Sequence, residues 1–534
     1  MIIPRPAQLT REPGWFFIPP ELHLTAGPGA EQSAELLSGY LGGSRPRTGT
    51  GPRIHLELLP APGREDRSPG GYDLSIAPDQ VTLTATGVDG LRNGVQTLRQ
   101  LLPSTALAAR DAGARTAGPP GDWRWPCLHI HDQPRLPWRG VMLDVARHFM
   151  PVEFLHEFID QLALHHLNVL HLHLTDDQGW RIEIEELPEL TRVGAWRGES
   201  MIGRSGSTRF DGTPHGGYYT RGQLRRLVAH AAERGVTIMP EIEMPGHAQA
   251  ALAAYPHLGN HPDARLPVWT SWGINENIFG VHDAALDFCR RVLDATMEIF
   301  PSQHIHIGGE ECPTVQWEHN HDAVKRAAQL GLDDVSSLHG WFLTEMRDFL
   351  AARGRTAVCW DETGELTDRL PEDMVLTAWR DPGHGALALG RKHQVIMAPH
   401  RWTYLDYRQS TAAHEPPGHP DLITTLADVY AYDPLAGGLP AARAGNGHRP
   451  SVLGAQAQIW TEFAPTSDHV LHLAYPRLCA FAEVVWTNGP HDLDDFRTRL
   501  APHLQRLQAL GAIPRPRTWW PDTPASGRTE TMNP

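Results

Sequence analysis

The 534-residue sequence contains no apolar run that approaches the roughly 18 consecutive residues needed to cross a membrane. Its first ten residues lack the basic segment followed by an apolar segment that marks a secretory signal. Positive charge is also in the minority, because 47 Lys and Arg stand against 62 Asp and Glu, for a formal net charge of −15. This balance argues against nucleic acid or an anionic membrane as a partner, since both bind clustered positive charge.

Cysteine is scarce. The five cysteines are odd in number, widely scattered and without CxxC spacing: Cys127, Cys289, Cys312, Cys359 and Cys479. This pattern favours free thiols in a reducing compartment. We therefore expect a cytoplasmic protein, although a secreted protein whose signal peptide has been removed would have the same composition. The sequence gives no indication of the oligomeric state.

The composition that remains is typical of a soluble protein with a real core, with 41% hydrophobic and 20% charged residues. Near the N-terminus, Tyr72–Ile76 and Val81–Thr86 alternate apolar and polar side chains, which predicts two half-buried strands. Residues 90–102 then carry a helical apolar stripe, and residues 109–121 are rich in Gly, Ala and Pro, as in a linker or surface loop. We interpret residues 1–125 as a small α/β domain.

From residue 135 onward, short apolar or β-branched runs alternate with amphipathic helical patterns. There are eight runs: Val141–Val145, Val169–Leu174, Val236–Ile242, His304–Ile307, Thr356–Trp360, Met374–Trp379, Gln394–Met397 and Val452–Trp460. Eight such units predict an α/β fold of the (β/α)8 TIM-barrel type over residues 135–512, followed by a loosely held tail, 513–534. Each run ends in charged or aromatic residues, and barrel enzymes carry their active sites at that C-terminal rim.

The strongest local signal is the segment His304–Glu311, in which a strand runs into Gly308-Gly309 and then presents Glu310 and Glu311. Adjacent strand residues point to opposite sides, so we expect the two carboxylates to have different roles. One of them can donate a proton if burial or a neighbouring carboxylate raises its pKa. The alternative is a helix N-terminus, where first-turn carboxylates simply suit the helix dipole.

Other rim residues support a catalytic interpretation. His247 follows a strand end beside acidic residues, where it can tune the pKa of a neighbouring carboxyl group. Trp360, Trp379 and Trp460 each close a strand, and Tyr404 lies just past another. Although most tryptophans pack in cores, this placement predicts an aromatic cage for a sugar ring or an acyl group.

A metal site is the competing interpretation. The pairs His171/His173 and His304/His306 have the spacing that places both side chains on one strand face. However, the sequence has no HExxH motif, and these pairs lie within strands and not at the rim. We therefore expect no metal and no other cofactor in the reaction.

Together, the motifs resemble glycoside hydrolase family 20, the β-N-acetylhexosaminidases, from about Arg135 to the last helix. The N-terminal part is similar to the small α/β domain that precedes the barrel in this family. The matching segments are Trp138–Phe149, Leu172–Arg181, Pro240–His247, His304–Glu311, Tyr404–Tyr407, Asp428–Pro434, Gln456–Glu462, Tyr475–Leu478 and Ala482–Trp486.

The resemblance implies an exo-acting, retaining enzyme that removes a terminal β-linked N-acetylhexosamine from glycans or chito-oligosaccharides. In that mechanism the substrate's own acetamido oxygen attacks the anomeric carbon and forms an oxazolinium intermediate. By position, Glu311 would be the general acid and base, with Asp176 and His247 behind it. Glu310 would hold the acetamido N–H group and Tyr404 the acetamido oxygen.

The same resemblance implies an acetamide cage and a set of hydroxyl-binding residues. The cage would be Trp360, Trp379 and Trp460, and the residues for the sugar hydroxyls would be Arg147, Asp406 and Glu462.

The sequence departs from the family at Glu310 and Glu243, where Asp is usual. Two alternatives follow: an enzyme of the same fold with another specificity, such as disaccharide release, or a sugar-binding protein that has lost catalysis. The intact Asp176, His247 and Glu311 argue against the second, because a pure binder needs no proton relay.

Overall fold

The computed structural model describes residues 2–19, 23–42, 52–60, 68–108, 123–362, 370–442 and 449–512. Its centre is a closed barrel of eight parallel strands, in the order β13-β14-β15-β16-β17-β20-β7-β8. The strands are β7 (Trp138–Asp144), β8 (Val169–His173), β13 (Thr237–Glu241), β14 (His304–His306), β15 (Thr356–Trp360), β16 (Val375–Ala378), β17 (Gln394–Met397) and β20 (Val452–Ile459). Each corresponds to one of the eight predicted runs, so the predicted barrel is confirmed.

Helices surround the barrel because their apolar stripes face it, as in α8, where the buried residues recur every three or four positions. The longer ones are α4 (Val152–Leu164), α6 (Arg221–Glu233), α8 (Asp283–Ile299), α10 (His321–Gln329), α11 (Leu338–Ala351), α13 (Pro382–Gly390), α16 (Ser467–Ala474), α17 (Arg477–Trp486) and α18 (Leu493–Ala509). Shorter elements decorate the loops: α5 (Glu189–Arg192), α7 (Gln249–Ala254), α9 (Val315–Glu318), α14 (His400–Thr403), α15 (Leu426–Tyr430), and the strands β9 (Thr175–Asp176), β10 (Gly179–Trp180), β18 (Tyr407–Arg408) and β19 (His419–Ile423).

The N-terminal part is a six-stranded mixed sheet, in the order β1-β6-β4-β5-β3-β2. Its elements are β1 (Gln8–Phe17), β2 (His23–Ala26), α1 (Glu31–Tyr40), β3 (Arg53–Leu58), β4 (Tyr72–Ile76), β5 (Gln80–Ala85), α2 (Val88–Gln100), α3 (Ser104–Ala108) and β6 (Arg124–Asp132). The two predicted strands and the following helix are all present. β6 continues this sheet past residue 125, whereas the predicted linker 109–121 and tail 513–534 lie outside the described residues.

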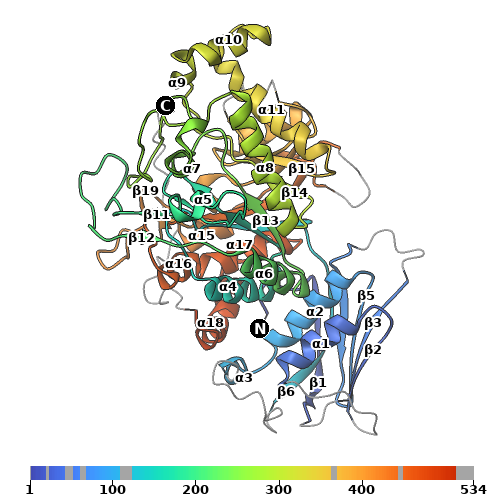
Figure 1. Ribbon diagram of the computed structural model, residues 1–534. Helices are drawn as coiled ribbons and strands as arrows, with labels where there is room; N and C mark the ends of the chain where they lie inside the picture. The colour runs from blue at the N-terminus through green and yellow to red at the C-terminus, as the bar shows by residue number, and fades with distance from the viewer. Residues whose placement is uncertain are drawn as a thin grey trace.

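The small domain packs directly on the barrel helices. Helix α1 contacts α6, α2 contacts α4, and α3 contacts α18, in the lower part of Figure 1. Trp486 of α17 is fully buried in the core of the small domain, where its indole donates to both oxygens of Asp132 at 3.1 and 3.0 Å. None of the described helices is both long and apolar enough to span a membrane.

Candidate active site

The eleven predicted site residues all lie at the C-terminal ends of the barrel strands. In strand order from β7 they are Arg147, Asp176, His247, Glu310, Glu311, Trp360, Trp379, Tyr404, Asp406, Trp460 and Glu462. Parallel strands of a closed barrel end at the same rim, so residues far apart in sequence meet there. The contacts described below link eight of them; of the other three, Glu310 adjoins Glu311 in the chain, and Asp406 and Glu462 interact electrostatically.

The Gly-Gly turn after β14 shapes the loop that carries the two glutamates. Gly308 has a φ of +64°, and a Cβ there would lie 1.8 Å from Oε2 of Glu243, so a side chain at this position would require the buried Glu243 carboxylate to move. Glu311 is itself in the left-handed region, with a φ of +46°. Its N–H donates to Oε1 of Glu362 at 3.0 Å, and Oε2 of Glu362 accepts from Arg380 at 2.8 Å. The glutamates therefore do not begin a helix; they sit on an anchored, strained loop.

A line of ionisable groups runs behind Glu311. His247 Nε2 lies 3.7 Å from Oε2 of Glu311. On the other side of the ring, Nδ1 lies 3.2 Å from Oδ1 of Asp176 and 3.3 Å from Oδ2 of Asp177. Arg147 forms an ion pair with Asp176, because its guanidinium lies 2.9 Å from Oδ2 of that residue. The predicted grouping of Asp176, His247 and Glu311 is thus present in space.

The electrostatics of this line determine where protons reside. Burial disfavours a charged His247, but Asp176 and Asp177 outweigh it and raise the pKa of His247 well above its usual value. Burial likewise acts to raise the pKa of Glu311, but the contact with His247 outweighs it and lowers that pKa. His247 and Glu311 therefore form a coupled pair that holds one proton, mainly on the imidazole.

Glu310 is in the opposite situation. The residue is only 8% exposed, and burial raises the pKa of its side chain to about 8. Burial and the neighbouring Glu310 also raise the pKa of Glu243 well above its usual value. The sequence predicts that one of the two adjacent carboxyl groups, Glu310 or Glu311, has a raised pKa. In the structure the pKa of Glu310 is raised and that of Glu311 is lowered.

The four predicted aromatic residues lie together. The rings of Trp360 and Trp460 are 5.9 Å apart, and those of Trp460 and Tyr404 are 6.4 Å apart. Trp379 stacks on Tyr404 with centroids 6.3 Å apart and an interplanar angle of 21°. These contacts join rings from four different strand ends into one apolar wall, a surface suited to a sugar ring or a small acyl group.

The three remaining residues form a polar group next to this wall. Arg147 lies over the ring of Trp460 at 4.8 Å, and Gln178 and Asp144 hold its guanidinium at 3.0 and 3.4 Å. Burial raises the pKa of Asp406 well above its usual value, and the negative charge of Glu462 raises it further. A neutral Asp406 can both donate and accept hydrogen bonds, as recognition of sugar hydroxyls requires.

Several buried polar atoms at the rim have no hydrogen-bond partner among the described residues: Oε2 of Glu310, Nε1 of Trp379 and Oδ1 of Asp406. An unsatisfied buried polar atom typically costs about 1–3 kcal/mol. Such atoms are expected where a protein binds a polar ligand. The arrangement can therefore hold a polar molecule against the aromatic wall and pass a proton to it through Glu311.

A buried group that the sequence did not predict links the Asp176–His247–Glu311 line to the aromatic wall. Glu241 is fully buried, accepts a hydrogen bond from Nε1 of Trp360 at 2.8 Å and contacts Nδ1 of His173. The other ring nitrogen of His173 lies 2.9 Å from Oδ2 of Asp176. The register of β8, β13 and β14, which no sequence motif specifies, aligns His173 and His306 with Glu241. Three of the four histidines weighed as metal ligands, His171, His173 and His306, therefore contact a buried carboxylate beneath the rim, whereas His304 packs against Trp138.

Comparisons with known proteins agree with this architecture. The family model described as "Glycosyl hydrolase family 20, catalytic domain" matches residues 136–489, and that of "Glycosyl hydrolase family 20, domain 2" matches residues 1–133. A β-hexosaminidase of Porphyromonas gingivalis is 37% identical over 83% of this chain, which spans about half (54%) of that relative's length. A β-hexosaminidase of Akkermansia muciniphila is 36% identical, with 81% of this chain and 83% of the relative covered.

Solved structures give the same result. A family 20 exo-β-N-acetylglucosaminidase of Vibrio harveyi, in complex with N-acetylglucosamine, has a TM-score of 0.83 and 29% identity, covering 97% of this chain and 78% of the other. A mutant Streptomyces plicatus β-hexosaminidase in complex with its product has a TM-score of 0.78 and 31% identity, covering 98% and 97%. The chain therefore belongs to glycosyl hydrolase family 20 and is a glycoside hydrolase.

Proposed function

We propose that this protein is an exo-acting, retaining β-N-acetylhexosaminidase that removes terminal β-linked N-acetylglucosamine or N-acetylgalactosamine by substrate-assisted catalysis. The observation that carries the proposal is the placement of the Asp176–His247–Glu311 line beside an aromatic wall and the buried, unpartnered Oε2 of Glu310. Two relatives support the substrate class, because one was solved with N-acetylglucosamine and the other with N-acetylglucosamine as product.

In the first step, the acetamido oxygen of the substrate attacks its own anomeric carbon. Glu311 gives a proton to the glycosidic oxygen, the bond from that oxygen to the anomeric carbon breaks, and the aglycone leaves as an alcohol. Glu310 accepts a hydrogen bond from the acetamido N–H group, and Tyr404 donates one to the acetamido oxygen. Holding the amide in this geometry provides a high effective concentration of nucleophile. The product of the step is an oxazolinium ion.

In the second step, water opens the oxazolinium ion. Glu311, now ionised, takes a proton from the water while the water oxygen bonds to the anomeric carbon. The bond from the acetamido oxygen to that carbon breaks, and the acetamide is regenerated. Two inversions at that carbon give net retention. Trp360, Trp379 and Trp460 exclude bulk water from around the acetamide.

The coupled pair explains how a carboxyl group of lowered pKa can serve as the acid. The proton that the pair holds resides mainly on His247, and a shift from its Nε2 to Oε2 of Glu311 generates the neutral acid. Asp176 stabilises His247 in either protonation state through Nδ1. The pair loses this proton only near the raised pKa of His247, so the acid function persists to correspondingly high pH.

Kinetics with paired substrates test the proposal. We expect turnover of 4-nitrophenyl N-acetyl-β-glucosaminide, and no measurable turnover of 4-nitrophenyl β-glucoside, which lacks the acetamide nucleophile. A thiazoline analogue of the oxazolinium ion should inhibit strongly because it resembles the bound intermediate. Trapping of a covalent glycosyl group on a carboxylate by a 2-fluoro sugar would contradict the mechanism. Release of an intact disaccharide from a longer glycan would show that the enzyme has the disaccharide-releasing specificity and does not remove single terminal sugars.

A further inference from the structure

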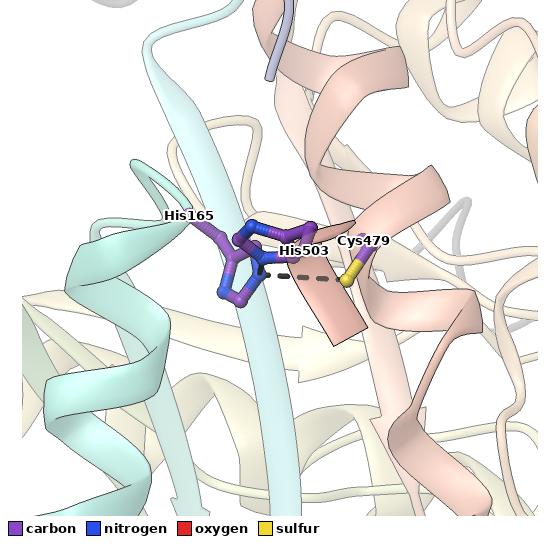
Figure 2. Close-up of side chains that lie close together, drawn as sticks. All are labelled: His165, Cys479 and His503. Atoms are coloured by element: carbon purple, nitrogen blue, oxygen red, sulfur yellow. Dashed lines mark hydrogen bonds between the residues drawn. The ribbon is translucent and has the colours of Figure 1, made fainter. Parts of the chain in front are cut away.

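A second cluster of reactive side chains lies away from the rim, among helices that cover the barrel. His165 directly follows α4, Cys479 lies in α17 and His503 lies in α18. All three are fully buried, and Figure 2 shows the thiol and both imidazoles drawn close together. We call this group the helix cluster. The proposed reaction uses none of its members.

In the helix cluster, two hydrogen-bond donors, on His503 and Cys479, face the single lone pair of His165 Nε2. Nδ1 of His165 donates to the carbonyl oxygen of Gln161 at 2.7 Å, so its Nε2 carries the lone pair. That nitrogen lies 2.8 Å from Nε2 of His503 and 3.4 Å from Sγ of Cys479. The N–H of His503 and the S–H of Cys479 therefore compete for a single acceptor.

Both imidazoles are in the state that binds metal ions. Burial lowers the pKa of His165 to about 4 and that of His503 well below its usual value, so both rings are neutral at pH 7. The bond from His165 to Gln161 also fixes its tautomer and ring orientation, as outer partners of metal-binding histidines do. Nδ1 of His503 has no hydrogen-bond partner among the described residues. The proton of His503 can therefore move to Nδ1, which frees Nε2 as a ligand atom.

We propose that His165, Cys479 and His503 form a site for a thiophilic d10 metal ion, Zn²⁺ or Cu⁺. Two imidazole nitrogens and a thiolate are ligands that these ions prefer. Bonds of about 2.0–2.1 Å to nitrogen and 2.3 Å to sulfur, at tetrahedral angles, place nitrogen and sulfur roughly 3.5 Å apart. Sγ of Cys479 and Nε2 of His165 are 3.4 Å apart, so this pair needs no rearrangement. The two nitrogens must separate by about half an ångström.

Binding involves proton release and no change of oxidation state. The thiol of Cys479 loses its proton to the buffer as the sulfur–metal bond forms, and each imidazole contributes a lone pair. Burial raises the pKa of this thiol well above its usual value, so affinity should fall as the pH is lowered. The ligands come from three separate elements, so an ion would fasten α18 to α4 and α17. The site is therefore structural, and it does not depend on the proposed hexosaminidase activity.

Metal analysis of the full-length, reduced protein tests this proposal. Protein freed of metal by a chelator is mixed with excess Zn²⁺, or with Cu⁺ under anaerobic conditions, and desalted; bound metal is then counted by mass spectrometry. We expect one ion per chain and a rise in Tm of about 2 °C or more. Co²⁺ should give a thiolate-to-metal charge-transfer band. The ion, the Tm rise and the band should be absent in Cys479→Ser.

A matched control separates this site from other sites. Cys289→Ser alters another buried cysteine, in α8, and should leave binding unchanged. His503→Gln should weaken binding at least tenfold, and it provides the same test if Cys479→Ser does not fold. Parent protein without stoichiometric metal would overturn the proposal. So would an ion retained in both the Cys479 and His503 variants, because that ion would belong to another group, such as the acidic residues around His247.

Discussion

Replacing Glu310 tests whether this residue, which stands where Asp is usual in the family, still holds the acetamido N–H group of the substrate. Oε2 of Glu310 is buried and unpartnered, so it is available to the acetamido N–H group. A charge-assisted hydrogen bond is worth about 1.5–3 kcal/mol, which corresponds to roughly ten- to over a hundredfold in rate if it forms in the transition state. We expect Glu310→Ala to lower kcat by this factor or more, and Glu310→Asp to lower it much less, because only its reach is shortened.

Glu310→Gln isolates the charge. A neutral acceptor makes a bond of about half the strength, so kcat should fall roughly 4- to 12-fold. The pH dependence is more specific. Because the pKa of Glu310 is raised to about 8, this residue is fully ionised only above that pH. Below it, the ionised fraction decreases about tenfold per pH unit. The kcat/KM of the parent, which reports the free enzyme, should therefore rise with pH up to about 8.

The assay is kcat and KM on 4-nitrophenyl N-acetyl-β-glucosaminide from pH 5 to pH 10, for the parent and the three variants. The rise toward pH 8 should vanish in Glu310→Gln. Glu243→Gln is the matched control, because it removes a neighbouring buried carboxyl group of raised pKa and should retain the rise. Near-parental kcat in Glu310→Ala, or an unchanged pH slope in Glu310→Gln, would refute the assigned role. An Asp variant many times faster than the parent would identify the natural enzyme as a weakened hexosaminidase.

Three further predictions follow from the same geometry. Glu311→Gln should lower kcat/KM, which reports the cleavage step, at least about 100-fold on a disaccharide but much less on the 4-nitrophenyl substrate, whose leaving group needs little protonation; equal losses of kcat/KM on both would argue against an acid role. Gly308→Ala should lower the Tm more than Gly331→Ala, because both have positive φ, near +64° and +68°, but only the first meets the carboxylate of Glu243; equal losses would show that this contact is unimportant. Glu241→Gln should destabilise the fold by about 3–5 kcal/mol at pH 7, because it removes the charge of one of the two carboxylates, Glu241 and Asp176, that pair with a charged, buried His173. Since the pKa of Glu241 is lowered, this difference should shrink as the pH falls below 4.5, and a denaturant titration at two pH values that shows no such change would contradict it.

The barrel was predictable because buried parallel strands are nearly continuous apolar runs. The bounds of β15 (Thr356–Trp360) and β17 (Gln394–Met397) coincide with the predicted runs. Knowing that the strands close into a barrel also places every strand end at one rim. Most of the site residues could therefore be grouped without any knowledge of distances, and the family resemblance added Asp406 and the individual roles.

The supporting residues could not be found in this way, because their partners are distant in sequence and their roles depend on side-chain direction. The hydrogen bond from the backbone of Glu311 to Glu362 spans 51 residues, and the contact between His173 and Glu241 spans 68. The helix cluster joins residues up to 338 positions apart, on helices whose apolar patterns indicate only burial. No local motif records such contacts.

The opposite pKa shifts of Glu310 and Glu311 show why side-chain direction matters at this site. The two residues share one peptide bond, yet Glu310 points into an enclosed region where Glu241 opposes its ionisation. The side chain of Glu311 is 35% exposed and faces His247, with Arg147 adding to the positive potential. One turn of the chain therefore presents a largely neutral and an ionised carboxyl group at the same pH. Substrate-assisted hydrolysis needs this asymmetry in reverse, with a proton on Glu311 and a charge on Glu310. In the proposed mechanism, protons therefore have to be redistributed within the site, through His247 on one side and by release from Glu310 on the other.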